Sequence, residues 1–393
     1  MISVHSINIW KILLFIILTV TACQSKTVLK NITQEKDNFE NKFFTLDFTE
    51  QNFDIEKFKE HFFTTFPHED PTLGNVVYDN TKWFNKNMIQ VKQGNGLYAY
   101  LKLREDSLGF DSFRFTTKSF FNLNEKTDKI LFVFKGTLPS AKGIWPAWWM
   151  NGSYEDEWTY RDPSPAVNDE LLNRYTGIGN YYDTPSSVNA TDWPSGGEID
   201  IIENINGEKY IHNTIHTCPQ MCDSEWNNEG IILNCANANA NDVNPGCSGR
   251  KYIIEKLEGT FACVWEREMI KFYYWSPKFN VKDNGGPLSS KPNPKLWDNN
   301  HLMNSVLLFN SNSECIDSLY QSWQCENCSE INDCKFQNLK MIFNATLCGV
   351  WAGNEFDSTS NSINNCKEYI KGEGKNKIDG AFMKIEYVSV SKL

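Results

Sequence analysis

The sequence predicts an all-β fold, a sandwich or barrel built from many short strands. From Phe43 onward, apolar and polar residues alternate with the period of two that a half-buried strand requires. Turn residues separate these segments, and few stretches show the period of a helix. The clearest segments are Leu97–Leu103, Phe113–Thr116, Ile130–Phe134, Ile270–Trp275 and Ala381–Val390. One short helix is expected at Ile55–Phe63.

Residues 1–22 have the pattern of a secretory signal peptide. A weakly basic start ends at Lys11, the apolar run Ile12–Val20 follows, and small residues precede the expected cleavage site. A run of this length is too short to span a bilayer, so no membrane span is expected. Cys23 and the residues before it also resemble a bacterial lipoprotein box, and a lipid anchor at Cys23 is therefore the alternative to free secretion.

The rest of the chain is expected to form a polar, flexible lead-in at residues 23–42 and a single domain at residues 43–393. We find no linker within this domain and no repeated segment. Gly152–Asp192 and Asn310–Asp333 read as long loops, where binding function tends to lie. The last predicted strand is followed by no hydrophobic tail, so no C-terminal lipid-anchor signal is expected.

The composition suits a large β protein that binds carbohydrate. Aromatic residues make up 14% of the 393 residues, and the apolar C–H faces of sugar rings stack on aromatic planes. A large β core also needs many aromatic residues, so composition alone leaves both interpretations open. The net charge of −11 argues against nucleic acid as a partner, because phosphate backbones attract Lys and Arg.

The cysteines after Cys23 read as disulfides if the chain is exported. A zinc site at Cys315–Cys334 is disfavoured, because no histidine lies near it and its first gap is long. The number of these cysteines is odd, so either one thiol is free or Cys23 is bridged. Sequons for glycosylation, a motif that also arises by chance, begin at Asn31, Asn151, Asn189, Asn327 and Asn344.

The segment Glu198–Glu203 combines three carboxyl groups with three isoleucines. Acidic residues are poor strand formers, and a carboxylate that is buried without a partner is strongly destabilising. Hydrolysis of a glycosidic bond gives a reason for such a segment, because it uses one carboxyl group as nucleophile or base and another as proton donor. The alternative is an acidic, solvent-facing edge strand that resists aggregation.

The spacing of these acids predicts a β-bulge. Residues two apart share one face of a strand, so Glu198 and Asp200 point the same way. Glu203 lies three residues further on and would point to the opposite face of a regular strand. One extra residue between Asp200 and Glu203 returns the last acid to the acidic face, and bulges are common beside active sites. Ile199 and at least one of the other two isoleucines would then fill the core.

Two segments, Trp145–Trp149 and Trp193–Glu203, together resemble glycoside hydrolase family 16, and more narrowly its fungal-type endo-1,3(4)-β-glucanase, or laminarinase, branch. Further matches, in chain order, are Asp70–Gly74, Val77–Tyr78, Asn213–Thr217, Ile342–Gly349, Trp351–Gly353 and Tyr387–Val390. The resemblance covers the predicted domain at 43–393. It implies a concanavalin-like jelly-roll β-sandwich of two curved antiparallel sheets with a concave substrate cleft.

The same resemblance implies the role of each acid. Glu198 matches the nucleophile, Asp200 a supporting carboxylate and Glu203 the general acid/base of a retaining enzyme. The two working carboxyl groups of such an enzyme lie roughly 5–5.5 Å apart, too close for a water molecule between them. Like charges this close raise one another's proton affinity, so we expect the titrations of the acids to be coupled.

Six further residues match or lie near positions of the family that contact substrate. They are Trp149, Trp193, Trp351, His216, Arg114 and Asn344. The tryptophans match sugar-stacking positions, the histidine matches a histidine of the cleft, and the last two are expected to face the cleft. Core packing of a tryptophan and a structural histidine are the alternatives. A cleft position for Asn344 implies that its sequon carries no glycan.

The chain departs from the family pattern at several places. Gly152–Asp192 is an insertion next to the expected cleft. Val350 stands where the branch often has Asp, which puts one subsite contact in doubt. The cysteine-rich loop at 310–335 is elaborated, and Cys348 is expected to pair with Cys366.

The sequence therefore predicts a secreted, monomeric endo-β-glucanase that cuts internal linkages of β-1,3- or mixed β-1,3/1,4-glucans. One alternative is a cell-wall glucan transglycosylase, because the glycosyl-enzyme intermediate is shared and only the acceptor differs. Another is a non-catalytic β-glucan-binding protein on the same fold, although such relatives typically lose the acids that this chain keeps. Xyloglucan transglycosylases lack the extra residue of the acid strand, so the Ile201–Ile202 pair argues against that activity. No cofactor is expected, and we find no ligand set that requires the structural calcium of many relatives.

Overall fold

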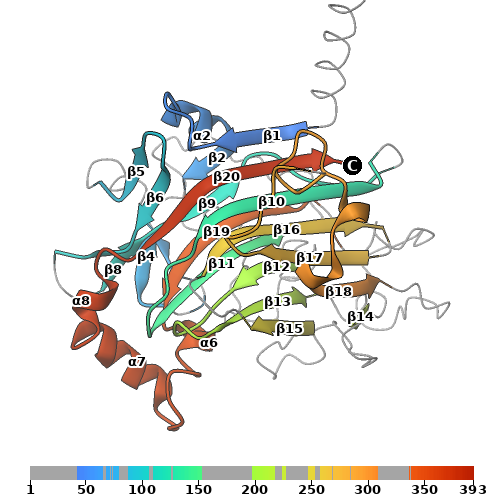
Figure 1. Cartoon of the computed structure of the whole chain (residues 1–393). Helices are drawn as coiled ribbons and strands as arrows, with labels where there is room; N and C mark the ends of the chain where they lie inside the picture. The colour runs from blue at the N-terminus through green and yellow to red at the C-terminus, as the bar shows by residue number, and fades with distance from the viewer. Residues whose placement is uncertain are drawn as a thin grey trace, which may run out of the picture. The chain divides into compact units, whose positions relative to one another are not determined.

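The computed structural model describes most of the chain after residue 41 (Figure 1). The described residues are 42–64, 68–70, 72, 74–78, 87–105, 109–124, 127–152, 197–216, 224–226, 247–252, 257–267, 269–283, 285–308, 336 and 338–393. The chain divides into two units, 1–43 and 44–393, and all described residues other than 42 and 43 belong to the second. The predicted signal peptide, nearly all of the predicted lead-in, the loop at 310–333 and all of the loop at 152–192 except Gly152 lie outside the described residues.

Two antiparallel sheets dominate the described part of the chain. The strands of the larger sheet, in spatial order, are β14 (Ser224–Trp226), β18 (Leu302–Leu308), β17 (Met269–Trp275), β16 (Glu258–Glu266), β10 (Lys129–Thr137), β20 (Phe382–Lys392), β6 (Gly96–Tyr100) and β5 (Ile89–Lys92), with β1 (Lys42–Asp47) also paired to β20. Those of the second sheet are β15 (Cys247–Tyr252), β13 (Tyr210–His216), β12 (Glu198–Glu203), β11 (Ile144–Asn151), β19 (Lys340–Leu347), β9 (Arg114–Thr117) and β2 (Phe62–Thr64). Strands far apart in sequence are neighbours, as β10 is of both β16 and β20, which is typical of a jelly roll (Figure 1).

A small third sheet and several short helices complete the described elements. The third sheet contains β3 (His68–Glu69), β4 (Val76–Tyr78), β8 (Phe110–Ser112) and β7 (Lys102–Leu103). The helices are α2 (Ile55–His61), α6 (Gly349–Ala352), α7 (Ser362–Lys371), α8 (Lys375–Ile378) and the 3-10 turns η1 (Pro294–Leu296) and η2 (Asn299–His301). No helix among the described residues is both long and apolar enough to cross a bilayer.

The predicted helix is confirmed, and it ends two residues earlier than expected. The side chain of Asp54 caps α2 by accepting a hydrogen bond from the N–H of Glu56 at 3.0 Å. Phe58 is the buried residue of this helix. Phe62 instead begins β2, where it pairs with Thr117 of β9, because strand pairing there satisfies the backbone groups that a longer helix would have used.

The predicted strands are confirmed, with one division. The segment Leu97–Leu103 forms two strands in different sheets, β6 and β7, which separate at Leu101. The N–H of Leu101 donates to the carbonyl of Ala381 at 2.8 Å, which extends the pairing with β20 by one residue, and Lys102 then pairs with Asp111 of β8. Alternation of apolar residues does not reveal such a change of partner, because both strands have the same period.

The core between the two large sheets is rich in aromatic side chains. Trp148 of β11 packs 5.5 Å from Phe134 of β10 and 5.8 Å from Phe343 of β19, measured between ring centroids. Phe261 of β16 stacks on Phe134 at 5.9 Å. Because Trp148 and its neighbours fill the inner face of β11, the alternate residues of that strand lie on the outer face of the smaller sheet.

The outer face of the larger sheet is covered by the segment that follows β17. Trp297, just after η1, packs edge-on against Tyr273 at 4.9 Å and Trp275 at 5.0 Å. The indole N–H of Trp297 donates to the carbonyl of Gly285 at 2.7 Å, which fixes this cover. The outer face of the smaller sheet, which carries the acids, is therefore the one available for chemistry.

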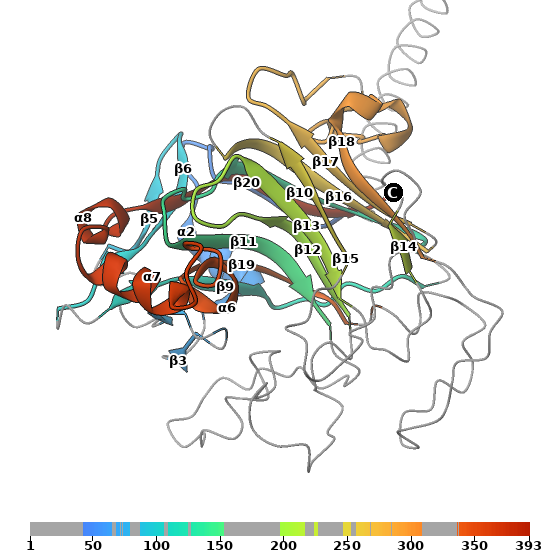
Figure 2. The same cartoon turned by 90° about the horizontal axis from the view of Figure 1, so that it is seen from below.

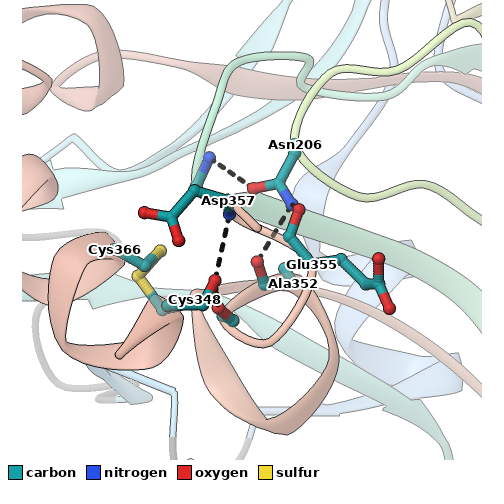
Figure 3. Close-up of a disulfide and its surroundings, with 9 residues drawn as sticks. Asn206, Cys348, Ala352, Glu355, Asp357 and Cys366 are labelled. Carbon is teal, nitrogen blue, oxygen red and sulfur yellow. Dashed lines mark hydrogen bonds between the residues drawn. A yellow bond between two sulfur atoms is a disulfide. The ribbon is translucent and has the colours of Figure 1, made fainter. Parts of the chain in front are cut away.

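A disulfide holds the segment after β19, as the sequence predicted. Cys348 and Cys366 are bridged, which ties the start of α6 to α7 (Figure 3). The side chain of Asn206, in the β12–β13 turn, donates to the carbonyls of Ala352 and Glu355 at 2.9 and 3.1 Å (Figure 3). Oδ1 of Asn206 also accepts a hydrogen bond from the N–H of Gly143, just before β11, so α6 lies at the end of the sheet where β11 begins (Figure 2). Among the described cysteines, Cys263 is a free, buried thiol.

Removing this bridge should destabilise the protein. The bridged residues are separated by 18 positions, and closing a loop of about this length stabilises a fold by roughly 3 kcal/mol, mainly by restricting the unfolded chain. We expect Cys348→Ala, Cys366→Ala and the double variant to lower the free energy of denaturant unfolding by similar amounts, because each removes the same bond. Additive losses in the double variant would contradict this expectation.

Candidate active site

The three acids lie on β12, and a bulge at Ile201 brings them to one face. Consecutive residues of β11 pair with Ile202 and Asp200, so Ile201 has no counterpart there. The register with β13 shifts at the same place, between Asp200 and Glu203. Ile201 is therefore the extra residue that the spacing of the acids predicted, and it turns Glu203 to the face of Asp200.

Two buried side-chain amides hold the bulge in place. Nδ2 of Asn213, on β13, donates to the carbonyl oxygen of Ile201 at 2.5 Å. Nδ2 of Asn304, on β18 of the opposite sheet, donates to Oδ1 of Asn213, also at 2.5 Å. Both asparagines are buried. The carbonyl that the bulge removes from the regular ladder is thus hydrogen-bonded, as a buried polar group requires.

The acids gather around one histidine, His216 of β13. Its Nε2 lies 3.2 Å from Oδ2 of Asp200 and 3.7 Å from Oε1 of Glu198. Glu203 also interacts electrostatically with His216 and Asp200. The exposed fractions of Glu198, Asp200 and Glu203 are only 8%, 3% and 7%, while the isoleucines of β12 are fully buried. The acids therefore share the outer face of the sheet, and the isoleucines fill the core behind them.

Glu203 is the acid with the most distinctive surroundings. Nε1 of Trp145 donates to its Oε1 at 2.9 Å, and the side chain of Thr214 donates a further hydrogen bond. Burial, followed by the charge of Asp200, raises the pKa of Glu203 well above its ordinary value, and the two hydrogen bonds and His216 oppose this rise. Burial also raises the pKa of Asp200 well above its ordinary value. Both groups hold a proton at a higher pH than an exposed acid does.

A buried polar network fixes Trp149 on the β9 side of the acids. Its indole Nε1 donates to Oδ1 of Asn344 at 2.8 Å. Nδ2 of Asn344 donates to the hydroxyl of Tyr78 at 3.2 Å, and that hydroxyl donates to Oδ2 of Asp70 at 2.7 Å. The guanidinium of Arg114 lies 5.0 Å from the centroid of the Trp149 ring. The orientation of this indole is thus set by contacts on its edge and on one face.

Arg114 connects this network to the acids. Burial lowers the pKa of its guanidinium, and the charges of Tyr78, Asp70 and Glu198 oppose that shift. An arginine remains charged in proteins, so a buried cation lies close enough to Glu198 to attract its carboxylate. Arg114 pairs with Asn344 across β9 and β19, which puts both residues in one row of the outer face, together with Ala147 and Glu203.

The remaining predicted residues have separate positions. Trp351, on α6, contacts residues of both strands that flank β12: its ring centroid lies 5.5 Å from that of Trp145 on β11 and 5.0 Å from that of His212 on β13. Trp193 lies outside the described residues. Asn344 and Asn151 are buried within strands, so their sequons are not accessible to a glycan. For Asn344 this agrees with the expectation, and for Asn151 it corrects the sequence interpretation.

Several residues on this face or behind it have no role that the sequence predicted. Trp145, Tyr78, Asp70 and Asn213 all lie inside the segments that resemble the family, and for the last three no pattern distinguishes their side chains from framework residues. Trp145 had a usable signal, because it is in phase with Trp149 along β11 and therefore faces the acids.

One group among the described residues has the spacing of a metal site. Oxygen atoms of Glu198 and Asp200 and a ring nitrogen of His216 all lie within 4.8 Å of one another. Carboxylates and imidazole are suitable ligands for several divalent ions. The same three groups form the acid cluster itself, so a metal would occupy the place where the carboxyl groups face one another.

Comparison with known proteins relates this geometry to a family. A family model described as an XgeA-like, catalytic GH16 domain matches residues 187–391, just over half of the chain. That range contains the whole of β12 and β13.

Two curated relatives align over most of the chain. Endo-1,3(4)-β-glucanase xgeA of Emericella nidulans is 24% identical over 346 residues, which cover 81% of this chain and 43% of that protein. "Probable glycosidase C21B10.07" of Schizosaccharomyces pombe is 24% identical over 337 residues, which cover 82% of this chain and 64% of that protein. The chain thus spans less than two thirds of the length of either relative.

A solved structure supports the fold. A mutant of laminarinase 16A, described as cyclising laminariheptaose, matches with a TM-score of 0.57 at 19% identity, covering 90% of this chain and 99% of that chain. At this level of identity the likeness concerns the fold alone. It confirms the predicted jelly-roll sandwich.

The Asn213 contact can be tested by substitution. Asn213→Ala removes the hydrogen bond to the buried carbonyl of Ile201, which should lower the free energy of unfolding by roughly 1–3 kcal/mol. It should also disturb the environment of Trp145 and Trp149, which lie next to the bulge, and so alter the near-UV circular dichroism. Asn122→Ala, which breaks a hydrogen bond to Asn338 away from the acids, is the matched control and should leave that spectrum unchanged. A wild-type spectrum for Asn213→Ala would contradict a role in shaping the site.

Proposed function

Because the chain belongs to the XgeA-like group of glycoside hydrolase family 16, we propose that it is a retaining endo-β-glucanase that hydrolyses β-1,3- or mixed β-1,3/1,4-glucans. The observation that carries the proposal is the bulged strand β12, which gathers Glu198, Asp200 and Glu203 on one face beside His216. The names of the relatives are consistent with this substrate class, since one is an endo-1,3(4)-β-glucanase.

The proposed reaction has two steps with opposite proton transfers. In the first, a carboxylate oxygen of Glu198 forms a bond to the anomeric carbon as the glycosidic C–O bond breaks, and Glu203 gives its proton to the leaving oxygen. In the second, Glu203 takes a proton from a water molecule whose oxygen attacks the same carbon, and the bond to Glu198 breaks. Two inversions retain the configuration, and each group ends in its starting state.

The electrostatics of the site suit this division of labour. Glu203 must carry a proton at the working pH, and burial next to Asp200 raises its pKa in that direction. Glu198 must act as an anion, and the guanidinium of Arg114 attracts its carboxylate. Asp200, which lies between them along β12 and contacts His216, would hold the histidine and separate the two working groups.

We assign the flanking aromatic residues to substrate binding. Trp149, Trp351 and Trp193 would stack on glucosyl rings, because pyranose C–H faces are apolar. His216 would contact the sugar at the point of cleavage. Arg114 and Asn344 would act by orienting Trp149, which both contact, and by supplying polar groups beside the acids.

The wider setting of the protein is part of the same proposal. We propose secretion through the predicted signal peptide at residues 1–22, with attachment through Cys23 as the alternative, and action as a monomer on an extracellular β-glucan. Transfer of the glycosyl unit to a second glucan instead of water would make the protein a transglycosylase. Binding without cleavage would make it a glucan-recognition protein, although the chain keeps all three acids.

The activity is tested with purified protein and a panel of laminarin, lichenan, agarose and xyloglucan. We expect new reducing ends from laminarin or lichenan, and products longer than the substrate would instead favour the transglycosylase. Glu203→Gln should lower turnover roughly 10²–10⁴-fold, because the leaving oxygen loses its proton donor, and Glu198→Gln should lower it at least as much. Glu266→Gln, which alters a carboxylate paired with Lys129 on the other sheet, is the control. Near-native turnover of either site variant would contradict the assignment.

The two roles can be separated with azide and an aryl β-glycoside. Azide should restore activity to Glu198→Ala and give a glycosyl azide of inverted configuration, because it attacks in place of the nucleophile. It should also restore Glu203→Ala but give a retained product, because it attacks the glycosyl-enzyme intermediate. Exchanged product configurations would show that the roles of the two acids are reversed.

The hydrogen bond from Trp145 should set the upper pH limit of activity. It stabilises the ionised form of Glu203, so Trp145→Phe should raise the pKa of that carboxyl further. The general acid works only while protonated, and activity is lost as pH rises through its pKa, so the alkaline limb of kcat/KM should move up by roughly one pH unit. Trp297→Phe, which loses an indole hydrogen bond on the other sheet, should leave the limb in place. An unmoved or lowered limb in Trp145→Phe would contradict this role.

A further inference from the structure

A series of rings leads from Glu203 to the edge of the smaller sheet. It starts at Trp145, whose indole N–H donates to Glu203 at 2.9 Å. Trp351 packs edge-on against Trp145 with 5.5 Å between ring centroids, and His212 packs edge-on against Trp351 at 5.0 Å. His212 lies directly opposite Glu203 on the neighbouring strand β13. The series therefore begins next to the proposed proton donor.

The series continues on β13 and reaches the edge strand β15. Tyr210 lies two residues before His212 on β13, so both side chains are on the outer face. Tyr210 pairs with Tyr252 of β15, and their rings are 5.5 Å apart at an angle of 69°. The guanidinium of Arg250 lies 4.8 Å from the Tyr210 ring, and Arg250 pairs with His212. We call Trp351, His212, Tyr210, Arg250 and Tyr252 the β15-edge track.

Exposure distinguishes the end of this track from the aromatic core. The Tyr252 side chain is 49% exposed, whereas the large rings between the two sheets are fully buried. Trp351, His212 and Tyr210 are partly exposed. In an edge-on pair, each ring keeps at least one face that its neighbour does not cover. Rings in this arrangement offer apolar faces to a ligand while the sheet holds their positions.

From this arrangement, and resting on the function proposed above, we propose that the β15-edge track binds the glucosyl units on the leaving-group side of the bond that is cut. The oxygen that Glu203 protonates belongs to the first of these units, so the leaving portion of the chain begins beside Glu203 and its neighbours. The opposite side is occupied by Arg114 and Trp149, which lie towards β9. A glucan that crosses the sheet past the acids continues over the rings of β13 and β15.

The chemistry of the track fits an uncharged polyol. Aromatic faces receive the C–H faces of pyranose rings, and the guanidinium of Arg250 can donate hydrogen bonds to hydroxyl groups between them. The Nε2 atom of His212 contacts the carboxylate of Glu208, which orients the ring. The result is a surface that combines apolar platforms with polar groups beside them.

The track is held in position before any ligand binds. Asn206 fixes the segment that carries Trp351 by donating to the carbonyls of Ala352 and Glu355, and Cys348–Cys366 closes the same segment (Figure 3). Strand pairing fixes Tyr210 and Tyr252. A preorganised platform loses little conformational entropy when a chain binds, which favours affinity for long substrates.

The proposal predicts that affinity depends on chain length through Tyr252. In an inactive Glu198→Gln background, we would measure binding of laminari-oligosaccharides of increasing length by calorimetry. Tyr252→Ala should weaken binding of long oligosaccharides roughly three- to tenfold and leave the shortest bound species unchanged, while Tyr252→Trp should keep the wild-type dependence. Phe279→Ala is the matched control, because Phe279 is 52% exposed but lies after β17, near the cover of the other sheet.

The cleavage pattern gives a second measurement in the active protein. Tyr252→Ala and Tyr210→Ala should raise KM for long laminarin chains, with little change in kcat, and should shorten the fragments released from the reducing end. Wild-type length dependence in both tyrosine variants would overturn the track while leaving the glucanase proposal intact. Failure of the wild-type protein to bind or cleave any β-glucan would overturn both.

Discussion

The outer face of the smaller sheet depends on one irregular residue, Ile201, and on the hydrogen bond that makes its irregularity tolerable. In a regular strand Glu203 would point into an aromatic core, where a carboxyl group has no partner. The bulge turns it outward but removes the carbonyl of Ile201 from the ladder. Asn213 supplies the missing hydrogen bond and is itself held by Asn304 from the opposite sheet. The geometry of the acids is therefore maintained from inside the sandwich.

The same face has two unlike halves on either side of the acids. Towards β9, a hydrogen-bonded network of polar side chains runs from the indole N–H of Trp149 to Asp70, and the guanidinium of Arg114 lies over the Trp149 ring. Towards β15 the rings pack edge to face, and Tyr252 at the edge of the sheet is 49% exposed. A buried cation near Glu198 and an indole donor to Glu203 give the two outer acids different electrostatic surroundings. Different roles for two identical side chains require such a difference.

Burial of several acids in one place destabilises a fold unless they are neutral or paired. The pKa values of Asp200 and Glu203 are both raised by burial, which means that their ionised forms are disfavoured in the folded protein. Their contribution to stability is therefore more favourable at low pH and is lost as pH rises towards the raised pKa values. The large aromatic core and the cover over the other sheet supply the stability that allows this arrangement.

The sequence by itself determined several of the main strands, the short helix, the Cys348–Cys366 disulfide and the position of the bulge. The bulge was predictable because the period of a strand is two, and the spacing from Asp200 to Glu203 breaks that period. The sequence could not reveal that Trp145 donates to Glu203 or that Asn304 supports Asn213, since these pairs are 58 and 91 residues apart. Such contacts depend on which strands become neighbours, and a jelly roll pairs strands that are distant along the chain. The tertiary structure alone decided them, because hydrogen bonds need a distance and a direction that no periodicity encodes.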